Sequence, residues 1–146
     1  MKKFVFTMTM AVVAAIGIQP IMAGPMQDVE IKKVPAKHTK ANSGPQMYRE
    51  YCAACHGMNG TGDGPAVPAL KATPSDLTAL SAKNGGKFPG MDVEAILRGN
   101  KELAAHGSAE MPTWGPIFRS LDANASSALM ELRVRNLTDY LKSIQK

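Results

Sequence analysis

The sequence predicts an all-α domain, and three features of the chain support this class. Near the C-terminus, apolar residues recur at helical spacings of three and four, at Met130, Val134, Leu137, Leu141 and Ile144. A second helical pattern runs from Gly44 to Cys55 and carries apolar residues and both cysteines of the chain on one face. No segment shows a convincing strand pattern, so we expect helices joined by loops.

The first helical pattern ends in Cys52-Ala53-Ala54-Cys55-His56, a run typical of covalent attachment of a c-type haem. Two thiols on one helical turn can each add to a vinyl group of the same porphyrin, and the histidine can bind the iron. A zinc site would need four ligands, and no second cysteine pair supplies them. A dithiol site would normally start a helix in a βαβ pattern, which is absent here. We therefore expect one haem c, bound through Cys52 and Cys55, with its iron on His56.

Residues 1–23 have the composition of a secretory signal peptide. Lys2 and Lys3 precede an apolar stretch at residues 4–18, and Pro20 and Ala23 suit a helix break and a cleavage site. The apolar stretch is short for a membrane span, which needs about 20 residues. We expect the signal peptide to be cleaved, which leaves a mature chain in the periplasm or elsewhere outside the cytoplasm, without a transmembrane segment.

The charge of the chain gives no reason to expect nucleic-acid binding. The formal charge of +5 falls to +3 when residues 1–23 are removed. Residues 44–146 contain 11 basic and 10 acidic side chains and are close to neutral. A nucleic-acid-binding domain would carry a clear basic excess.

The mature chain divides into an arm and a domain. Residues 24–43 lack sustained periodicity and are rich in lysine, proline and small residues, so we expect a flexible N-terminal arm. His38, within this arm, is expected at the surface rather than at the iron. The domain then spans residues 44–146, and Pro45 suits the first position of its first helix.

The haem motif is followed by a loop from Gly57 to Pro74 that is rich in glycine and proline. Long loops in small domains usually carry function or wrap something, and this one is placed to wrap the proximal edge of a haem. A metal-bound histidine generally donates its second N–H to an acceptor. The carbonyl of Pro68 or Pro65 can accept from His56, and the sequence leaves this choice open.

Three further helices are expected after the loop. The first two are short: Ser75–Ser81 with Ser75 as its cap, and Asp92–Arg98 with Asp92 as its cap and Gly99 beyond its end. The last runs from about Asn124 to Ile144. Its charged residues are expected in solvent, namely Glu131, Arg133, Arg135 and Lys142.

The loop from Gly107 to Phe118 supplies the second expected iron ligand. Met111 precedes Pro112, which favours an extended backbone that can present a thioether to the iron. Trp114, in the same loop, is counted with the residues expected at the haem. His106 is the main alternative ligand. Met58 is too close to His56 to reach the opposite face, and the weaker rivals are Met91 and Met130.

From Gly44 to the C-terminus, the chain resembles the bacterial mono-haem c-type cytochromes of the small His/Met type. The resemblance rests on Gly44-x3-Tyr48-x3-Cys52, on Met111-Pro112 and on Leu137-x2-Tyr140-Leu141. It implies that the first and last helices cross, with Gly44 and Tyr48 against the turn from Leu137 to Leu141. It also implies that the Pro68 carbonyl receives the His56 N–H and that Leu70 lies against the haem.

We expect a one-electron carrier rather than an enzyme, with a redox protein as donor and another as acceptor. His56 and Met111 would fill both axial positions of the iron and leave no site for a substrate. Two alternatives remain open. The chain can be the cytochrome subunit of a larger dehydrogenase or oxidase complex, peripheral to a membrane. It can instead be a gas-binding or peroxidatic haem protein if Met111 is not a ligand.

Overall fold

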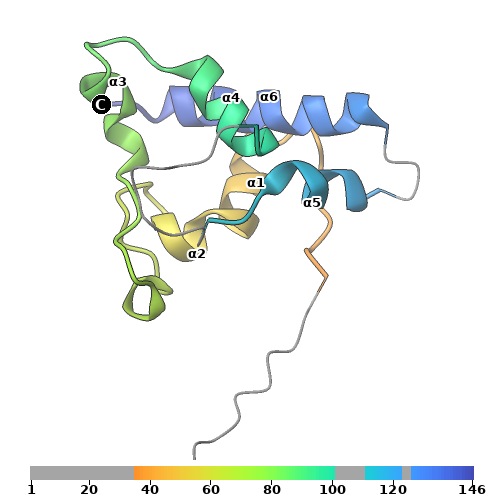
Figure 1. Ribbon diagram of the computed structural model, residues 1–146, viewed down its shortest axis with the longest axis horizontal. Helices are drawn as coiled ribbons and strands as arrows, with labels where there is room; N and C mark the ends of the chain where they lie inside the picture. Colours follow the sequence, from red (N-terminus) through yellow and green to blue (C-terminus); the bar gives the residue numbers. More distant parts are fainter. Residues whose placement is uncertain (1–34, 101–110, 123–125) are drawn as a thin grey trace, which may run out of the picture. The chain divides into compact units, whose positions relative to one another are not determined.

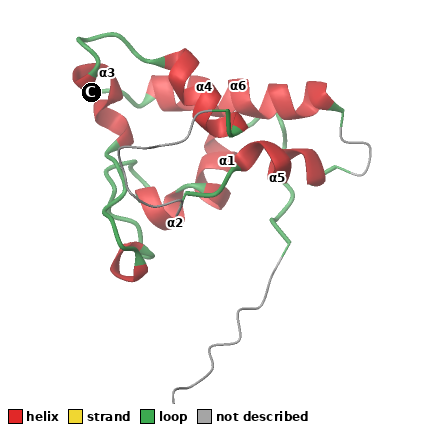
Figure 2. Ribbon diagram, in the orientation of Figure 1, coloured by secondary structure: helices red, strands yellow, loops and turns green. Residues whose placement is uncertain are grey.

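The computed structural model describes residues 35–100, 111–122 and 126–146. The helices in these ranges are α1 (Gly44–Tyr51), α2 (Ala53–His56), η1 (Val67–Ala69), η2 (Leu77–Ala79), α3 (Leu80–Lys83), α4 (Gly90–Arg98), α5 (Trp114–Ser120) and α6 (Ser127–Ser143). No strand occurs among them (Figure 2), which confirms the all-α class. The predictions for residues 1–23 and for His106 concern residues outside the described ranges. None of the described helices is long and apolar enough to cross a membrane.

Helix α6 is the element on which α1, α4 and α5 pack (Figure 1). Its apolar stripe is buried as predicted, with Met130, Val134, Leu137 and Leu141 in the core. The rings of Tyr48 and Tyr140 lie 5.2 Å apart between α1 and α6. The expected crossing of the first and last helices is therefore confirmed.

Helix α5 lies where the sequence indicates only a loop. Gly115 and Pro116 have low helix propensity, although Pro116 lies in the first turn, where its missing N–H breaks no helical hydrogen bond. Trp114 and Phe118, four residues apart, are nevertheless both buried in the core on one face of this helix. Burial of two aromatic side chains thus outweighs the local preference.

Three predicted helix ends differ from the observed ones. The first helical pattern is interrupted at Cys52, which separates α1 from α2. The cap of η2 is Asp76 rather than Ser75, because the Asp76 carboxylate accepts the backbone N–H of Thr78 at 2.8 Å. Asp92 lies in the first turn of α4 and is not its cap, whereas Gly99 ends that helix as predicted.

Arg133 was expected in solvent, and this prediction is wrong. The side chain is 1% exposed, and its guanidinium donates to Asp122 at 3.0 Å and to the Thr39 hydroxyl at 2.9 Å. Arg133 follows Met130 by three residues and so lies at the edge of the apolar stripe. Its charge is paired by Asp122, and the Thr39 hydroxyl accepts a further N–H.

The described residues before α1 are packed against the rest of the domain. Thr39 is 1% exposed, and the Tyr51 hydroxyl donates to the Lys37 carbonyl at 2.7 Å. His38 lies at the surface, with its Nε2 2.8 Å from the Asp122 carboxylate. The compact unit that contains these residues is Val34–Lys146. The boundary between a flexible arm and the domain at residue 44 stays a prediction.

Candidate haem-attachment site

The two cysteines of the motif lie on one helical turn. The backbone N–H of Cys55 and that of His56 both donate to the Cys52 carbonyl, at 3.1 and 2.8 Å. Both thiols are free; Cys52 is buried and Cys55 half-buried. Among the described residues, no group of three or more histidines, cysteines and carboxylates could hold a metal ion. Within those ranges, the two cysteines and His56 therefore have no fourth ligand nearby that would complete a zinc site.

The loop after the motif runs back along α2 and closes its end. The N–H groups of Gly62, Gly64 and Ala66 donate to the carbonyls of His56, Cys55 and Ala54 at 2.9, 3.1 and 2.9 Å. These are the carbonyls that a helix end leaves without partners. A Cβ on Gly64 would collide with the carbonyls of Ala54 and Cys55, so only glycine allows this approach. The loop therefore holds the motif in a fixed conformation.

The imidazole of His56 is oriented by Ser75. Its Nδ1 lies 3.0 Å from the Ser75 carbonyl oxygen. The prediction that Pro68 or Pro65 supplies this carbonyl is wrong, and both prolines are exposed. The loop continues past them and returns to the motif where the Leu77 N–H donates to the Gly60 carbonyl at 2.7 Å. This return brings residue 75, not residue 68, to the imidazole.

The state of the imidazole suits a metal ligand. Burial lowers the pKa of His56, while the hydrogen bond to Ser75 acts in the opposite direction. Burial therefore favours the neutral ring, which is the form that binds a metal. Because Nδ1 is engaged by a carbonyl, Nε2 is the nitrogen left for iron.

The state of the first thiol argues against a redox dithiol site. Burial raises the pKa of Cys52 to about 12, and the neighbouring Cys55 adds to the shift. A thiol with this pKa stays protonated at neutral pH. A reactive or disulfide-exchanging cysteine needs the opposite, a lowered pKa and access to solvent. The high pKa of Cys52 thus argues against a redox dithiol at this motif.

Tyr48 has a second role that the sequence did not reveal. Its ring is fully buried in the core. Its hydroxyl also donates to the Gly57 carbonyl at 2.7 Å, directly after His56. Burial raises the pKa of Tyr48 far above its usual range, so the hydroxyl remains a donor. The helix crossing is thereby connected to the backbone of the motif.

Trp114 lies close to the motif through Tyr51. The indole ring of Trp114 is 5.4 Å from the ring of Tyr51, which directly precedes Cys52. Met111 is half-buried and packs against the core. The indole Nε1 of Trp114 is buried and has no hydrogen-bond partner among the described residues. A buried donor without a protein acceptor is compatible with a bound group that supplies one.

The other predicted site residues have the following positions. Pro68 lies in η1 and is exposed, and Leu70 follows η1 and is half-buried. Their contact with a haem stays a prediction. Among the rival ligands, Met58 and Met91 are 62% and 89% exposed, and Met130 is buried in the core on α6.

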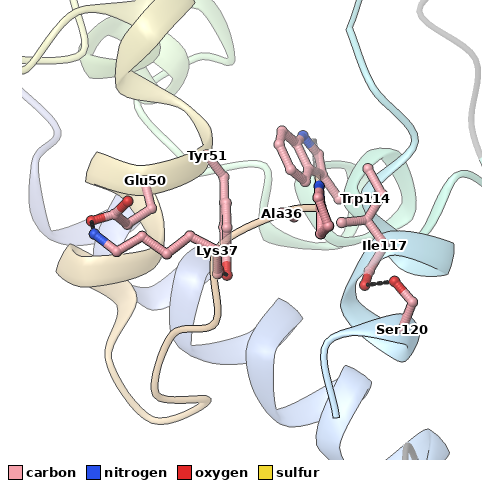
Figure 3. Close-up of a pocket in the computed structure, with 8 residues that line it drawn as sticks. Ala36, Lys37, Glu50, Tyr51, Trp114, Ile117 and Ser120 are labelled. Atoms are coloured by element: carbon pink, nitrogen blue, oxygen red, sulfur yellow. Dashed lines mark hydrogen bonds and ion pairs between the residues drawn. The ribbon is translucent and has the colours of Figure 1, made fainter. Parts of the chain in front are cut away.

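A pocket of about 480 Å³ opens beside α1 (Figure 3). It is lined by Pro35, Ala36, Lys37, Glu50, Tyr51, Trp114, Ile117 and Ser120. Lys37 reaches across one side to Glu50 and forms an ion pair of 2.9 Å. None of Cys52, Cys55, His56 and Met111 lines this pocket, so it is not the place expected for a haem.

Comparison with known families gives a match over most of the domain. The sequence model of the family described as cytochrome c oxidase, cbb3-type, subunit III matches residues 39–130, more than half of the 146-residue chain. Comparison with curated proteins and with solved structures gives no match. The matched range contains the Cys52–His56 motif and Met111. The chain therefore belongs to this family and is a c-type cytochrome, a haem-bearing electron-transfer protein.

Proposed function

We propose that this chain is a one-electron carrier outside the cytoplasm, with a single haem c bound through Cys52 and Cys55. The observation that carries the proposal is the orientation of His56. Its Nδ1 is engaged by the Ser75 carbonyl at 3.0 Å, which leaves Nε2 for the iron. Two free thiols lie on the same helical turn as this imidazole. When bound, the haem supplies an iron that changes between the ferrous and ferric states.

The number of haems follows from the cysteine count. The chain contains two cysteines, both in the motif, and each thiol forms one thioether with a porphyrin vinyl group. One attachment site is therefore available. The ladder of hydrogen bonds from Gly62, Gly64 and Ala66 holds both thiols and the imidazole on one rigid turn. Such preorganisation limits the rearrangement that accompanies a change of oxidation state.

Met111 is proposed as the second axial ligand. A thioether favours the reduced iron and raises the reduction potential. Pro112 directly follows Met111, and Trp114 three residues later contacts Tyr51 at the start of the motif. With both axial positions filled by protein, no position would remain for a substrate or gas. This ligand pair favours electron transfer over the gas-binding and peroxidatic alternatives.

The proposed location and partners follow from the family and from the leader sequence. Cytochrome c domains are typically extracytoplasmic, and residues 1–23 have the composition of a cleaved signal peptide. The mature chain would then meet one redox protein as donor and another as acceptor. The near-neutral domain gives no reason to expect nucleic acid as a partner.

The family description favours a second role, as a haem-bearing subunit of a membrane oxidase. In that role the chain would be a fixed relay, bound peripherally to the complex. A carrier and a subunit differ in how they purify. A carrier should appear in the soluble extracytoplasmic fraction, and a subunit should remain with a membrane complex until detergent or salt releases it.

The proposal is tested by producing the full chain in a bacterial host that matures c-type cytochromes. We expect a product whose mass exceeds that of the mature polypeptide by one haem and whose haem survives denaturation. The ferric protein should show the weak long-wavelength absorption band of a thioether–iron bond. Cys52→Ser combined with Cys55→Ser should abolish covalent haem. A wild-type chain without covalent haem would contradict the proposal.

A further inference from the structure

The C-terminal residues of the chain hold the segment that follows Ser75. The side-chain amide of Gln145 donates to the carbonyls of Leu77 and Leu141, both at 2.7 Å. Its carbonyl oxygen accepts the backbone N–H of Ser81 at 2.8 Å. One side chain at the end of the chain thus bridges α6, η2 and α3 through their backbones.

The segment held by Gln145 is the one that orients His56. Leu77 is two residues beyond Ser75, whose carbonyl lies 3.0 Å from the Nδ1 of His56. The Leu77 N–H donates to the Gly60 carbonyl at 2.7 Å, so both backbone polar groups of this residue are fixed. The Ser75 carbonyl has little freedom to move away from the imidazole while these bonds hold.

We propose that Gln145 is a positioning residue for the iron ligand: through Leu77 it holds the Ser75 carbonyl against the Nδ1 of His56. The inference rests on the proposed function in that His56 binds the haem iron. A hydrogen bond from Nδ1 makes the imidazole more basic and fixes its orientation. A more basic ligand stabilises ferric iron and lowers the reduction potential.

A role in general packing is not sufficient to explain these contacts. Gln145 lies beyond the last residue of α6, where chain ends are poorly ordered unless they are held down. Its three side-chain hydrogen bonds all go to backbone groups, and two of them go to Leu77 and Ser81, on either side of Thr78. Thr78 itself is 2% exposed. The Gln145 side chain therefore fixes the position of the backbone between Leu77 and Ser81.

The test compares haem-loaded full-length variants by nuclear magnetic resonance and by redox titration. Gln145→Ala removes all three bonds, and Gln145→Glu keeps the acceptor for Ser81 but removes the donor to Leu77. Ser143→Ala is the matched control, because the Ser143 hydroxyl donates to the Tyr140 carbonyl of its own helix and, within the described part of the chain, makes no bond to the segment after Ser75. We measure the hydrogen-exchange rate of the His56 Nδ1–H and the midpoint potential.

We expect both Gln145 variants to exchange the His56 Nδ1–H faster, on the order of fivefold to tenfold, as loss of one hydrogen bond implies. Their midpoint potential should rise, while Ser143→Ala matches the wild type in both measurements. Haem content and the ligand band should stay unchanged, because His56 still binds the iron.

The outcomes of this test separate the role of Gln145 from the proposed function. A haem-loaded wild type whose Gln145 variants show the same exchange rate and potential would overturn the role of Gln145 alone. The same holds if Gln145→Glu behaves like the wild type, because the Leu77 contact would then be irrelevant. A wild-type protein without covalent haem would overturn the proposed function, and the role of Gln145 at the iron with it.

Discussion

Gly44 lies directly against the backbone carbonyl of Asn136 at the crossing of α1 and α6. A Cβ at position 44 would collide with this carbonyl oxygen and would lie 2.7 Å from the Cβ of Tyr140. The first of these atoms is a backbone oxygen and the second is a Cβ, so a change of side-chain rotamer cannot move either of them away. The separation of the two helices therefore depends on a glycine at this position.

Gly44→Ala should lower the free energy of unfolding by about 1–3 kcal/mol, since the helices must separate to make room. The change is measured by thermal or denaturant unfolding of the haem-loaded protein. Gly90→Ala is the matched control, because the nearest atoms to a Cβ there are 3.7 Å away on the Phe88 ring. The control should be neutral or slightly stabilising. Equal stability of both variants would show that the crossing is not close-packed.

The contacts of Thr39 predict that the segment before α1 contributes to stability. The Thr39 hydroxyl accepts from Arg133 at 2.9 Å and lies 2.8 Å from the Tyr51 hydroxyl. Thr39→Val keeps the shape of the side chain and leaves a buried guanidinium with one partner fewer. We expect a loss of about 1–3 kcal/mol, measured by denaturant unfolding.

Thr73→Val, at an exposed position, is the control for this substitution and should change the stability by less than about 0.5 kcal/mol. Limited proteolysis adds an independent measurement, because the sites at Lys37 and Lys40, in the segment before α1, should resist cleavage in the folded protein. Cleavage close to Gly44 without loss of stability would instead support a flexible arm up to that residue.

The carboxylate of Asp122 predicts a specific acid sensitivity. Hydrogen bonds from His38 and from Arg133 hold the pKa of Asp122 below its usual range. A carboxyl whose pKa is lower in the folded state stabilises the fold fully above its ordinary pKa. This contribution is lost as the pH falls through the lowered, folded-state pKa.

Asp122→Asn should therefore be less stable than the wild type at neutral pH, and the difference should shrink at acid pH. Denaturant midpoints measured at both pH values test this. Asp139→Asn, an exposed change on α6, serves as the control. A stability difference for Asp122→Asn that does not depend on pH would show that the charge of the carboxylate is not what matters.

Features encoded by local spacing could be predicted from the sequence. The apolar stripe of α6 repeats every three or four residues, and the Cys-x-x-Cys-His run lies within five consecutive residues. Gly44 and Tyr48 precede Cys52 at fixed spacings of eight and four residues. The crossing of α1 and α6 was implied by the resemblance and is confirmed by the Tyr48–Tyr140 contact. Periodicity identifies which face of a helix is apolar, and this predicted the buried stripe of α6.

Features that depend on distant partners could not be predicted. Burial of Arg133 depends on Thr39 and Asp122, which helical periodicity does not encode. The choice of Ser75 over Pro68 depends on where a long loop returns to the motif. One signal was available: Arg133 lies three residues after Met130, at the edge of the apolar stripe, and this spacing could have indicated burial.

The last prediction concerns the second axial ligand, because the choice between electron transfer and ligand binding depends on it. Met111→Ala should open a coordination position while His56 and both thioether bonds keep the haem in place. The midpoint potential should fall, since the ligand that favours ferrous iron is removed. The reduced variant should bind carbon monoxide readily, whereas the wild type should bind it poorly.

His106→Ala is the matched variant, because His106 is the main alternative ligand. It should leave the midpoint potential and the carbon monoxide binding of the wild type nearly unchanged. If His106→Ala gains carbon monoxide binding and Met111→Ala does not, the iron has two histidine ligands. Such a protein would work at a lower potential than a methionine-ligated one, because no thioether would stabilise its ferrous state.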